Sequence, residues 1–64
     1  MINVGDVVIV QQAYEDDQGN YHDLSATVLS IEADGHVDLE FRAPTEIREF
    51  LAGCEWTLDS LDTP

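Results

Sequence analysis

One stretch of this 64-residue chain constrains its fold more than any other: residues 26–41, where two alternating apolar runs are joined by Ala33-Asp34-Gly35. Alternation with a period of two is typical of strands that bury one face, and a glycine between two such runs indicates a β-hairpin. We therefore expect a hairpin here, and we expect its apolar face to organise the core.

The length of the loop decides the register of this hairpin. A two-residue turn at Asp34-Gly35 would pair Ile31 with Asp38 and mix core and solvent residues on one face. A three-residue loop over 33–35, with Gly35 in the left-handed conformation that glycine adopts at low cost, avoids this mixture. The three-residue loop predicts an apolar face made of the pairs Ile31–Val37, Leu29–Leu39 and Thr27–Phe41. It predicts a solvated face made of the pairs Glu32–His36, Ser30–Asp38, Val28–Glu40 and Ala26–Arg42.

Further elements are expected on both sides of the hairpin. Residues 4–10 contain a Gly-Asp turn and then four β-branched residues, which predicts a strand that is either covered on both faces or strongly coiled at a barrel seam. The acid-rich residues 15–23 predict a mobile loop, with a strand that resumes near Tyr21 as the alternative.

The C-terminal third is more ambiguous. Residues 45–52 favour a short helix, because apolar residues fall at helical spacing and Gly53 suits a helix stop, although strict alternation also fits a strand. Residues 55–58 predict a short closing strand and residues 59–62 a single helical turn. Residues 62–64 are expected to be a frayed tail.

The charge excludes several partners. Fourteen acidic residues and two arginines give a net charge of −12, with no lysine, so the chain lacks the basic side chains that nucleic acids and anionic membranes require. A basic protein partner is favoured instead. No apolar run approaches the roughly 18 residues of a membrane-spanning helix. A single cysteine and the absence of a signal-like N-terminus favour the cytoplasm.

Three segments in this order, residues 4–10, 26–41 and 56–61, resemble the small SH3-like barrels of the Tudor and KOW type. A Gly-Asp start to the first strand, an alanine-led second strand, a glycine hairpin and a closing tail recur in those families. The resemblance implies a mainly β fold, namely a single SH3-like barrel of about five strands over residues 1–64. A short helix or helical turn near 45–52 would accompany it, and the domain would be a binding module.

Two functions of those families, RNA binding and recognition of a cationic side chain, are poorly supported by this sequence. The basic residues with which KOW-like domains contact RNA are missing here. A Tudor-like reading would place Tyr14, Tyr21, Phe41 or Trp56 around a cationic side chain, but the hairpin register assigns Phe41 to the core.

The acidic residues are the main functional indication. Twelve net charges match those on about 20 Å of duplex DNA, similar to the diameter of such a domain, so mimicry of DNA is numerically feasible. Mimicry requires the acids to share a face; the alternative is that they are scattered and promote solubility. Trp56 is either a core anchor or an exposed hot spot. The predicted partner-binding residues are Glu15, Asp16, Asp17, Asp23, Glu32, Asp38, Glu40 and Trp56.

The sequence offers no motif for catalysis or for metal binding. We expect His36 to be a surface partner of Glu32 and not a catalytic base. We expect Cys54 to be a small core residue and not a nucleophile, because no His or Asn is evident that would activate it. Four residues have side chains that could bind a metal: Asp16, Asp17, His22 and Asp23. Their spacing does not fit a calcium loop, and the Cys or His ligands of a zinc site are absent nearby. We predict no enzyme activity, no cofactor and no metal.

These observations predict a small, acidic, non-enzymatic module that binds a basic protein. Its sharpest version is an inhibitor that mimics nucleic acid and occupies the binding surface of a DNA- or RNA-binding host protein, as small phage or mobile-element proteins do. The alternative is a structural or assembly subunit that self-associates through an exposed β edge.

Overall fold

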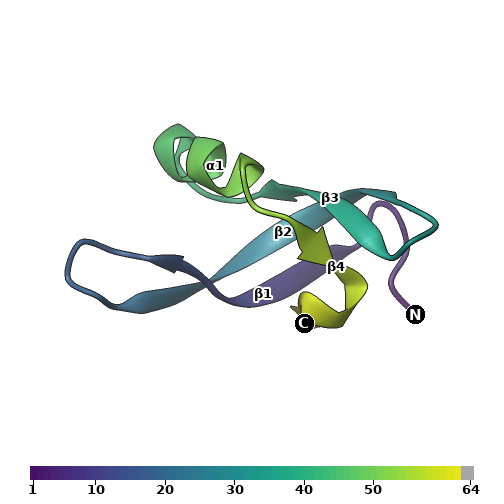
Figure 1. The fold of residues 1–64 in the computed structure, drawn as a ribbon, viewed down its shortest axis with the longest axis horizontal. Coiled ribbons are helices and arrows are strands. Elements are labelled where there is room, and N and C mark those ends of the chain that lie inside the picture. The colour runs from purple at the N-terminus through teal and green to yellow at the C-terminus, as the bar shows by residue number, and fades with distance from the viewer. Residues whose placement is uncertain (63–64) are drawn as a thin grey trace.

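The computed structural model describes residues 1–62, so Thr63 and Pro64 of the predicted frayed tail lie outside the described residues. Figure 1 shows the elements in chain order. They are β1 (Val7–Glu15), β2 (Tyr21–Ile31), β3 (His36–Phe41), α1 (Thr45–Ala52), β4 (Trp56–Thr57), the 3₁₀ turn η1 (Leu58–Ser60) and β5 (Leu61–Asp62).

The five strands form one antiparallel sheet in the order β4-β3-β2-β1-β5. The two edge strands, β4 and β5, follow each other in the chain and are joined only by η1. Because three residues connect the two edges, the sheet has to curve until its edges approach each other. The predicted mainly β fold with five strands and one short helix is confirmed, and its topology is consistent with a small barrel.

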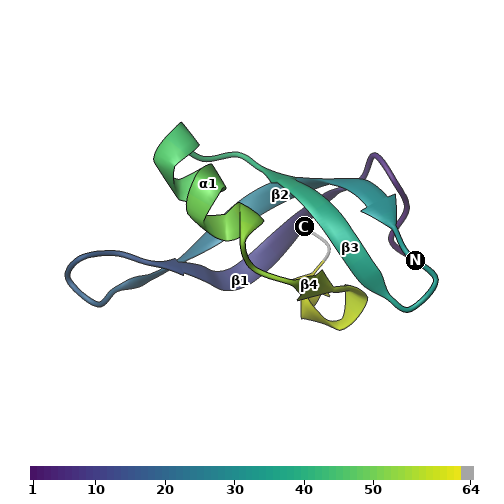
Figure 2. The same cartoon turned by 45° about the horizontal axis from the view of Figure 1, so that its top comes forward.

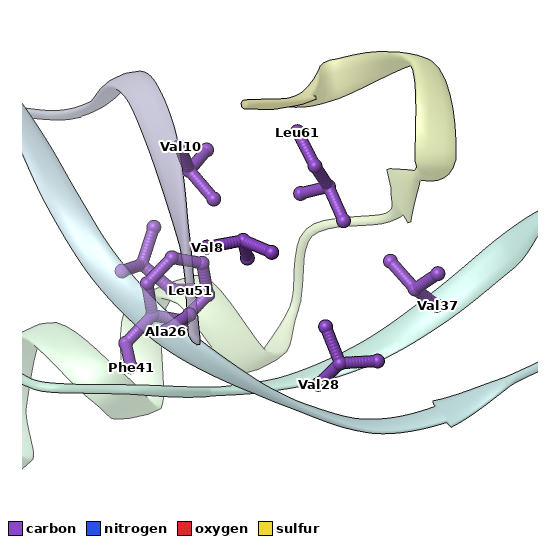
Figure 3. Close-up of a cluster of buried hydrophobic side chains, with 8 residues drawn as sticks. All are labelled: Val8, Val10, Ala26, Val28, Val37, Phe41, Leu51 and Leu61. Atoms are coloured by element: carbon purple, nitrogen blue, oxygen red, sulfur yellow. The ribbon is translucent and has the colours of Figure 1, made fainter. Parts of the chain in front are cut away.

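Eight buried apolar residues make up the core. They come from β1, β2, β3, α1 and β5, so every long element contributes at least one side chain (Figure 3). Among residues 1–62, no polar or charged residue is buried. The core residues are Val8, Val10, Ala26, Val28, Val37, Phe41, Leu51 and Leu61.

The loop of the β2–β3 hairpin has the predicted three-residue form. The N–H of Glu32 donates to the carbonyl of His36 at 2.8 Å, and the N–H of Gly35 donates to the carbonyl of Glu32 at 3.0 Å. Gly35 has a φ of 93°, in the left-handed region that glycine tolerates best. The predicted pairs Ile31–Val37 and Ser30–Asp38 are confirmed next to this loop.

The rest of the predicted register is wrong by one residue. Pairing shifts between Val28 and Ser30, so Leu29 is the extra residue of a β-bulge. A shift of one residue exchanges the two faces of a strand. Val28, predicted to be solvated, is 1% exposed, whereas Leu29, predicted to be in the core, is 51% exposed. The observed pairs beyond the bulge are Val28–Leu39, Thr27–Glu40 and Ala26–Phe41.

The predicted acidic loop over 15–23 is also shorter than expected. β1 continues to Glu15 and β2 begins at Tyr21, so the strand predicted as the alternative is confirmed and only residues 16–20 form the turn. The carboxylate of Asp16 holds this turn by accepting the backbone N–H groups of Gln18 and Asn20, both at 2.9 Å. Tyr21 is 59% exposed, so its ring lies largely outside the core.

The β1–β2 hairpin contains a second irregularity. Regular pairing stops at Val10 and resumes at Tyr14. Between them Gln12 has a φ of 52°, which is unfavourable for a residue with a side chain. The N–H of Gln12 donates to the carboxylate of Asp23 at 2.8 Å, which stabilises this conformation.

The helix expected over residues 45–52 is present, and the strand alternative for that segment is wrong. Its first residue, Thr45, follows Pro44, and its one buried residue, Leu51, faces the core. Gly53 ends the helix in a right-handed conformation. The predicted turn over 59–62 lies at 58–60 instead. None of the helices in the described part of the chain is long and apolar enough to cross a membrane.

Candidate partner-binding site

Four of the seven predicted acidic residues lie at the two ends of the molecule. Glu15, Asp16 and Asp17 lie at the tip of the β1–β2 hairpin, and Glu32 lies at the tip of the β2–β3 hairpin. Figures 1 and 2 place these tips at opposite ends of the long axis, which measures 36 Å. Duplex DNA of that length would carry about 21 charges, so a net charge of −12 gives a lower density than DNA.

Two of the acids near the β1–β2 turn have structural partners. Asp16 accepts the turn hydrogen bonds, and its other carboxylate oxygen lies 2.9 Å from Nε2 of His22. The side-chain hydrogen bond with His22 and the backbone bond from Asn20 lower the pKa of Asp16 below its usual range. Asp23 holds the backbone of Gln12. Both carboxylates therefore contribute to the local fold of the hairpin.

The tip of the β2–β3 hairpin holds His36 between two carboxylates. Nδ1 of His36 lies 2.9 Å from Asp34, and Nε2 lies 3.8 Å from Glu55. Glu32, the predicted partner, lies within 4.8 Å of the ring and its charge also raises the pKa of His36, but Asp34 makes the closest contact. The hydrogen bond that the His36 ring donates to Asp34 is the main cause that raises the pKa of His36, and the backbone N–H of His36 is the main cause that lowers the pKa of Asp34.

We expect Asp34→Asn to lower the pKa of His36, because asparagine keeps the turn acceptor but loses the negative charge. The raised pKa of His36 means that its contribution to stability is complete below the unfolded pKa and is lost as pH rises through the folded pKa. The lowered pKa of Asp34 means that its contribution is lost as pH falls through its own folded pKa. The pair therefore stabilises the fold most between about pH 4 and pH 6.5, the usual pKa values of the two groups.

An NMR titration of the His36 ring measures this shift. Asp59→Asn is the matched control, because it removes the same charge from η1. Equal His36 pKa values in Asp34→Asn and the unsubstituted protein would contradict the pairing.

Three residues at this hairpin tip have the chemistry of metal ligands. Glu32, Asp34 and His36 each offer one ligand atom, and these atoms lie within 4.8 Å of one another. The hydrogen bonds of the turn already explain why they gather, since Asp34 bonds both the ring and the backbone of His36. The cluster is exposed or half-exposed, as expected for solvated acids.

Asp38 and Glu40 are the acids that lie closest together on one strand. Both are exposed on β3, and because they are two residues apart they point to the same face of the sheet. Ser30, opposite Asp38, donates its hydroxyl to that carboxylate at 2.6 Å. Glu32, which was predicted on the same face, lies just after the end of β2, where its N–H donates to the carbonyl of His36.

A groove lies beside these two acids. It has a volume of about 310 Å³ and runs between the last residues of β3 and the C-terminal half of α1. We call it the β3 groove; its apolar part is formed mainly by Leu29, Leu39, Phe41, Leu51, Ala52 and Trp56. Asp38, Glu40 and Arg48 provide its charged side chains.

A second hollow adjoins the groove. It has a volume of about 320 Å³ and contains the acidic side chains of the β2–β3 tip, with Glu55. It shares four lining residues with the β3 groove, so the two hollows are neighbours: Val37, Asp38, Cys54 and Trp56.

Trp56 has features of both roles predicted for it. It is half-buried and its ring centroid lies 5.4 Å from that of Phe41, as in a core anchor. It also lines both hollows, as a hot spot would. Its Nε1 is buried and has no hydrogen-bond partner within residues 1–62.

Tyr14 does not join Trp56 and Phe41 in one cage. Tyr14 lies 6.5 Å from Phe50 and 6.2 Å from His22 between ring centroids, on the β1–β2 hairpin side of α1. Phe41 is in the core, as predicted. Cys54, predicted to be a core residue, is exposed.

Sequence reasoning missed the helical wall of the groove. Arg48, Leu51 and Ala52 were not candidates, because their role depends on where α1 packs. The available signal was the helical spacing of Leu51 with the other apolar residues of 45–52, which identifies the face that packs on the sheet but not the strand it meets.

No protein-family model, curated protein or solved structure matches the chain. The resemblance to Tudor and KOW barrels therefore stays a prediction beyond the level of the fold.

Proposed function

We propose that this protein is a small, acidic, non-enzymatic binding module of the cytoplasm that engages a basic protein partner through the outer face of β3. The observation that carries the proposal is the juxtaposition of two exposed carboxylates, Asp38 and Glu40, with an apolar groove that contains Trp56. An apolar centre with a charged rim is the usual composition of a protein-binding surface.

The net charge of −12 supports a basic partner. It attracts cationic surfaces over a Debye length and speeds their encounter, while it repels nucleic acids and anionic membranes. We therefore propose that the partner is a protein that presents lysine or arginine next to an apolar residue.

Mimicry of nucleic acid is the sharper form of this proposal. In that form the partner is a DNA- or RNA-binding protein of a host cell, and this protein is an inhibitor of the phage or mobile-element type. Four of the predicted acids lie at the two ends of a 36 Å molecule, which favours a partner that contacts β3 over one that follows a continuous line of charge.

We expect Asp38→Asn combined with Glu40→Gln to weaken binding of the partner about tenfold, because close charge pairs at interfaces contribute on the order of 1.4 kcal/mol together. The partner is first captured on the immobilised protein, identified and purified. Its Kd is then measured by calorimetry in a series of salt concentrations.

The control is Glu15→Gln combined with Asp17→Asn, which removes the same two charges from the β1–β2 turn. It should change Kd by less than about threefold at physiological salt, because exposed charges beyond about 8 Å are screened. Equal losses in both double variants, or a partner that resists high salt, would contradict the proposal.

A further inference from the structure

We infer that the partner binds by adding an extended, basic segment to the free edge of β3, where it lies in the β3 groove as a sixth strand. This inference rests on the proposed function, since it names the mode by which the same surface takes its partner. It goes further by assigning the main-chain groups that make the contact.

The outer edge of β3 is open beyond Val37. β4 pairs only with His36 and Val37. The residues before β4 do not continue this pairing, because they connect β4 to α1. Residues 38–41 therefore have no strand on their outer side among residues 1–62. An unpaired strand edge is a template for another segment.

The direction of the free backbone groups follows from two hydrogen bonds. The carbonyl of His36 accepts from Glu32, and the N–H of Arg42 donates to Ser25, so even-numbered residues of β3 bond to β2. Successive residues of a strand point their backbone groups to opposite edges. Leu39 and Phe41 thus direct their N–H and C=O groups to the outer edge.

The groove fits a strand that alternates basic and apolar residues. Leu39 and Phe41 face the apolar side with Leu51, whereas Asp38 and Glu40 face the other side. Directly opposite residues of paired strands lie within about 5.5 Å, so lysines opposite the two acids would form cross-strand pairs. Arg48 is the one basic residue in the groove, and it is outnumbered by the two carboxylates.

Charge argues against a second copy of the chain as the occupant. Each copy has a net charge of −12, and two such chains repel each other at the distance of a shared sheet. The segment of β3 that is free is only four residues long, which gives two hydrogen-bonded residues and little compensation for that repulsion. A basic segment gains both the hydrogen bonds and the charge pairs.

The test uses the blocked pentapeptide acetyl-Lys-Val-Lys-Val-Lys-amide with the full chain. Binding is followed by Trp56 fluorescence and by amide chemical shifts, which should change most at residues 38–41. N-methylation of both valine amides removes the donors that face Leu39 and Phe41 and should weaken binding about tenfold, since two hydrogen bonds contribute roughly 1.4 kcal/mol together. N-methylation of the third and fifth residues, both lysine, blocks amides that face solvent and should weaken it less than about twofold.

A protein variant gives a second readout. Ala52→Trp fills the groove from an exposed position of α1 without a change of charge and should abolish peptide binding. Ala33→Trp, in the exposed β2–β3 turn outside both hollows, should leave it unchanged.

The outcomes separate this inference from the proposed function. If both methylated peptides bind like the unmodified one, or Ala52→Trp binds normally, charge alone holds the segment; strand addition is then wrong and the proposed function stands. If the protein forms dimers that Ala52→Trp disrupts, the edge belongs to a second copy and the inference is overturned. If the peptide fails to bind and the partner's affinity is independent of Asp38 and Glu40, both are overturned.

Discussion

Val28→Asp is expected to unfold the protein, whereas Leu29→Asp one position further on is expected to leave it folded. Val28 is 1% exposed and Leu29 is 51% exposed, because the bulge in β2 turns Leu29 outward. A buried, unpaired carboxylate costs about 3–5 kcal/mol, and a chain of this length has only about 3–10 kcal/mol of stability in total. The exposed aspartate at position 29 should cost less than about 1 kcal/mol.

Circular dichroism and urea denaturation measure both variants. Val28→Thr is nearly isosteric with valine and should lower the free energy of unfolding by about 1–3 kcal/mol, which keeps the effect measurable if the aspartate variant has no folded state. If the substitution at position 29 lowered the free energy of unfolding more than the one at position 28, the bulge would be contradicted and the register without it would be correct.

Leu51→Ala should lower the free energy of unfolding by about 2–5 kcal/mol, because Leu51 is the one residue of α1 that is fully buried against the core. The neighbouring substitution Phe50→Ala removes more atoms but should cost about 1 kcal/mol or less. Phe50 is 64% exposed and its main contact is an edge-to-face arrangement with Tyr14. Urea denaturation of the two variants gives the comparison.

The difference between the two helix variants also tests the groove, since α1 forms its wall. If Leu51→Ala keeps its stability, the helix is not anchored by Leu51, and the β3 groove has no fixed shape. If Phe50→Ala costs as much as Leu51→Ala, contact with the β1–β2 hairpin contributes as much to holding α1 as the core does.

Local patterns were sufficient for much of the fold. The apolar alternation and Gly35 identified the β2–β3 hairpin and its three-residue loop, and the spacing within 45–52 identified α1. These features depend on residues close together in the chain, where turn chemistry and periodicity act directly.

The β-bulge shows why the register was only partly predictable. Val28 and Leu29 are both apolar, so an alternating pattern can place either one in the core. The choice depends on the opposite strand, where Phe41 pairs with the small Ala26 instead of Thr27. Cross-strand packing of this kind decides between two registers that local preference leaves nearly equal.

The candidate site was predictable only in its charges. Asp38 and Glu40 share a face because of strand geometry alone, which the alternation in 36–41 reveals. The groove needs α1 to pack beside β3, and no local pattern contains that placement. The split of the acids between two hairpin tips likewise depends on how the strands are arranged in space.

The pairing of β5 with β1 has a consequence for the order in which the protein folds. The two hairpins join neighbouring strands through short loops, but Val10 and Leu61 are about 50 positions apart in the chain, so their pairing closes a long loop at a greater entropic cost. Both residues belong to the core. During synthesis on a ribosome, the hairpins can therefore form early, but the core stays open on one side until Leu61 has emerged.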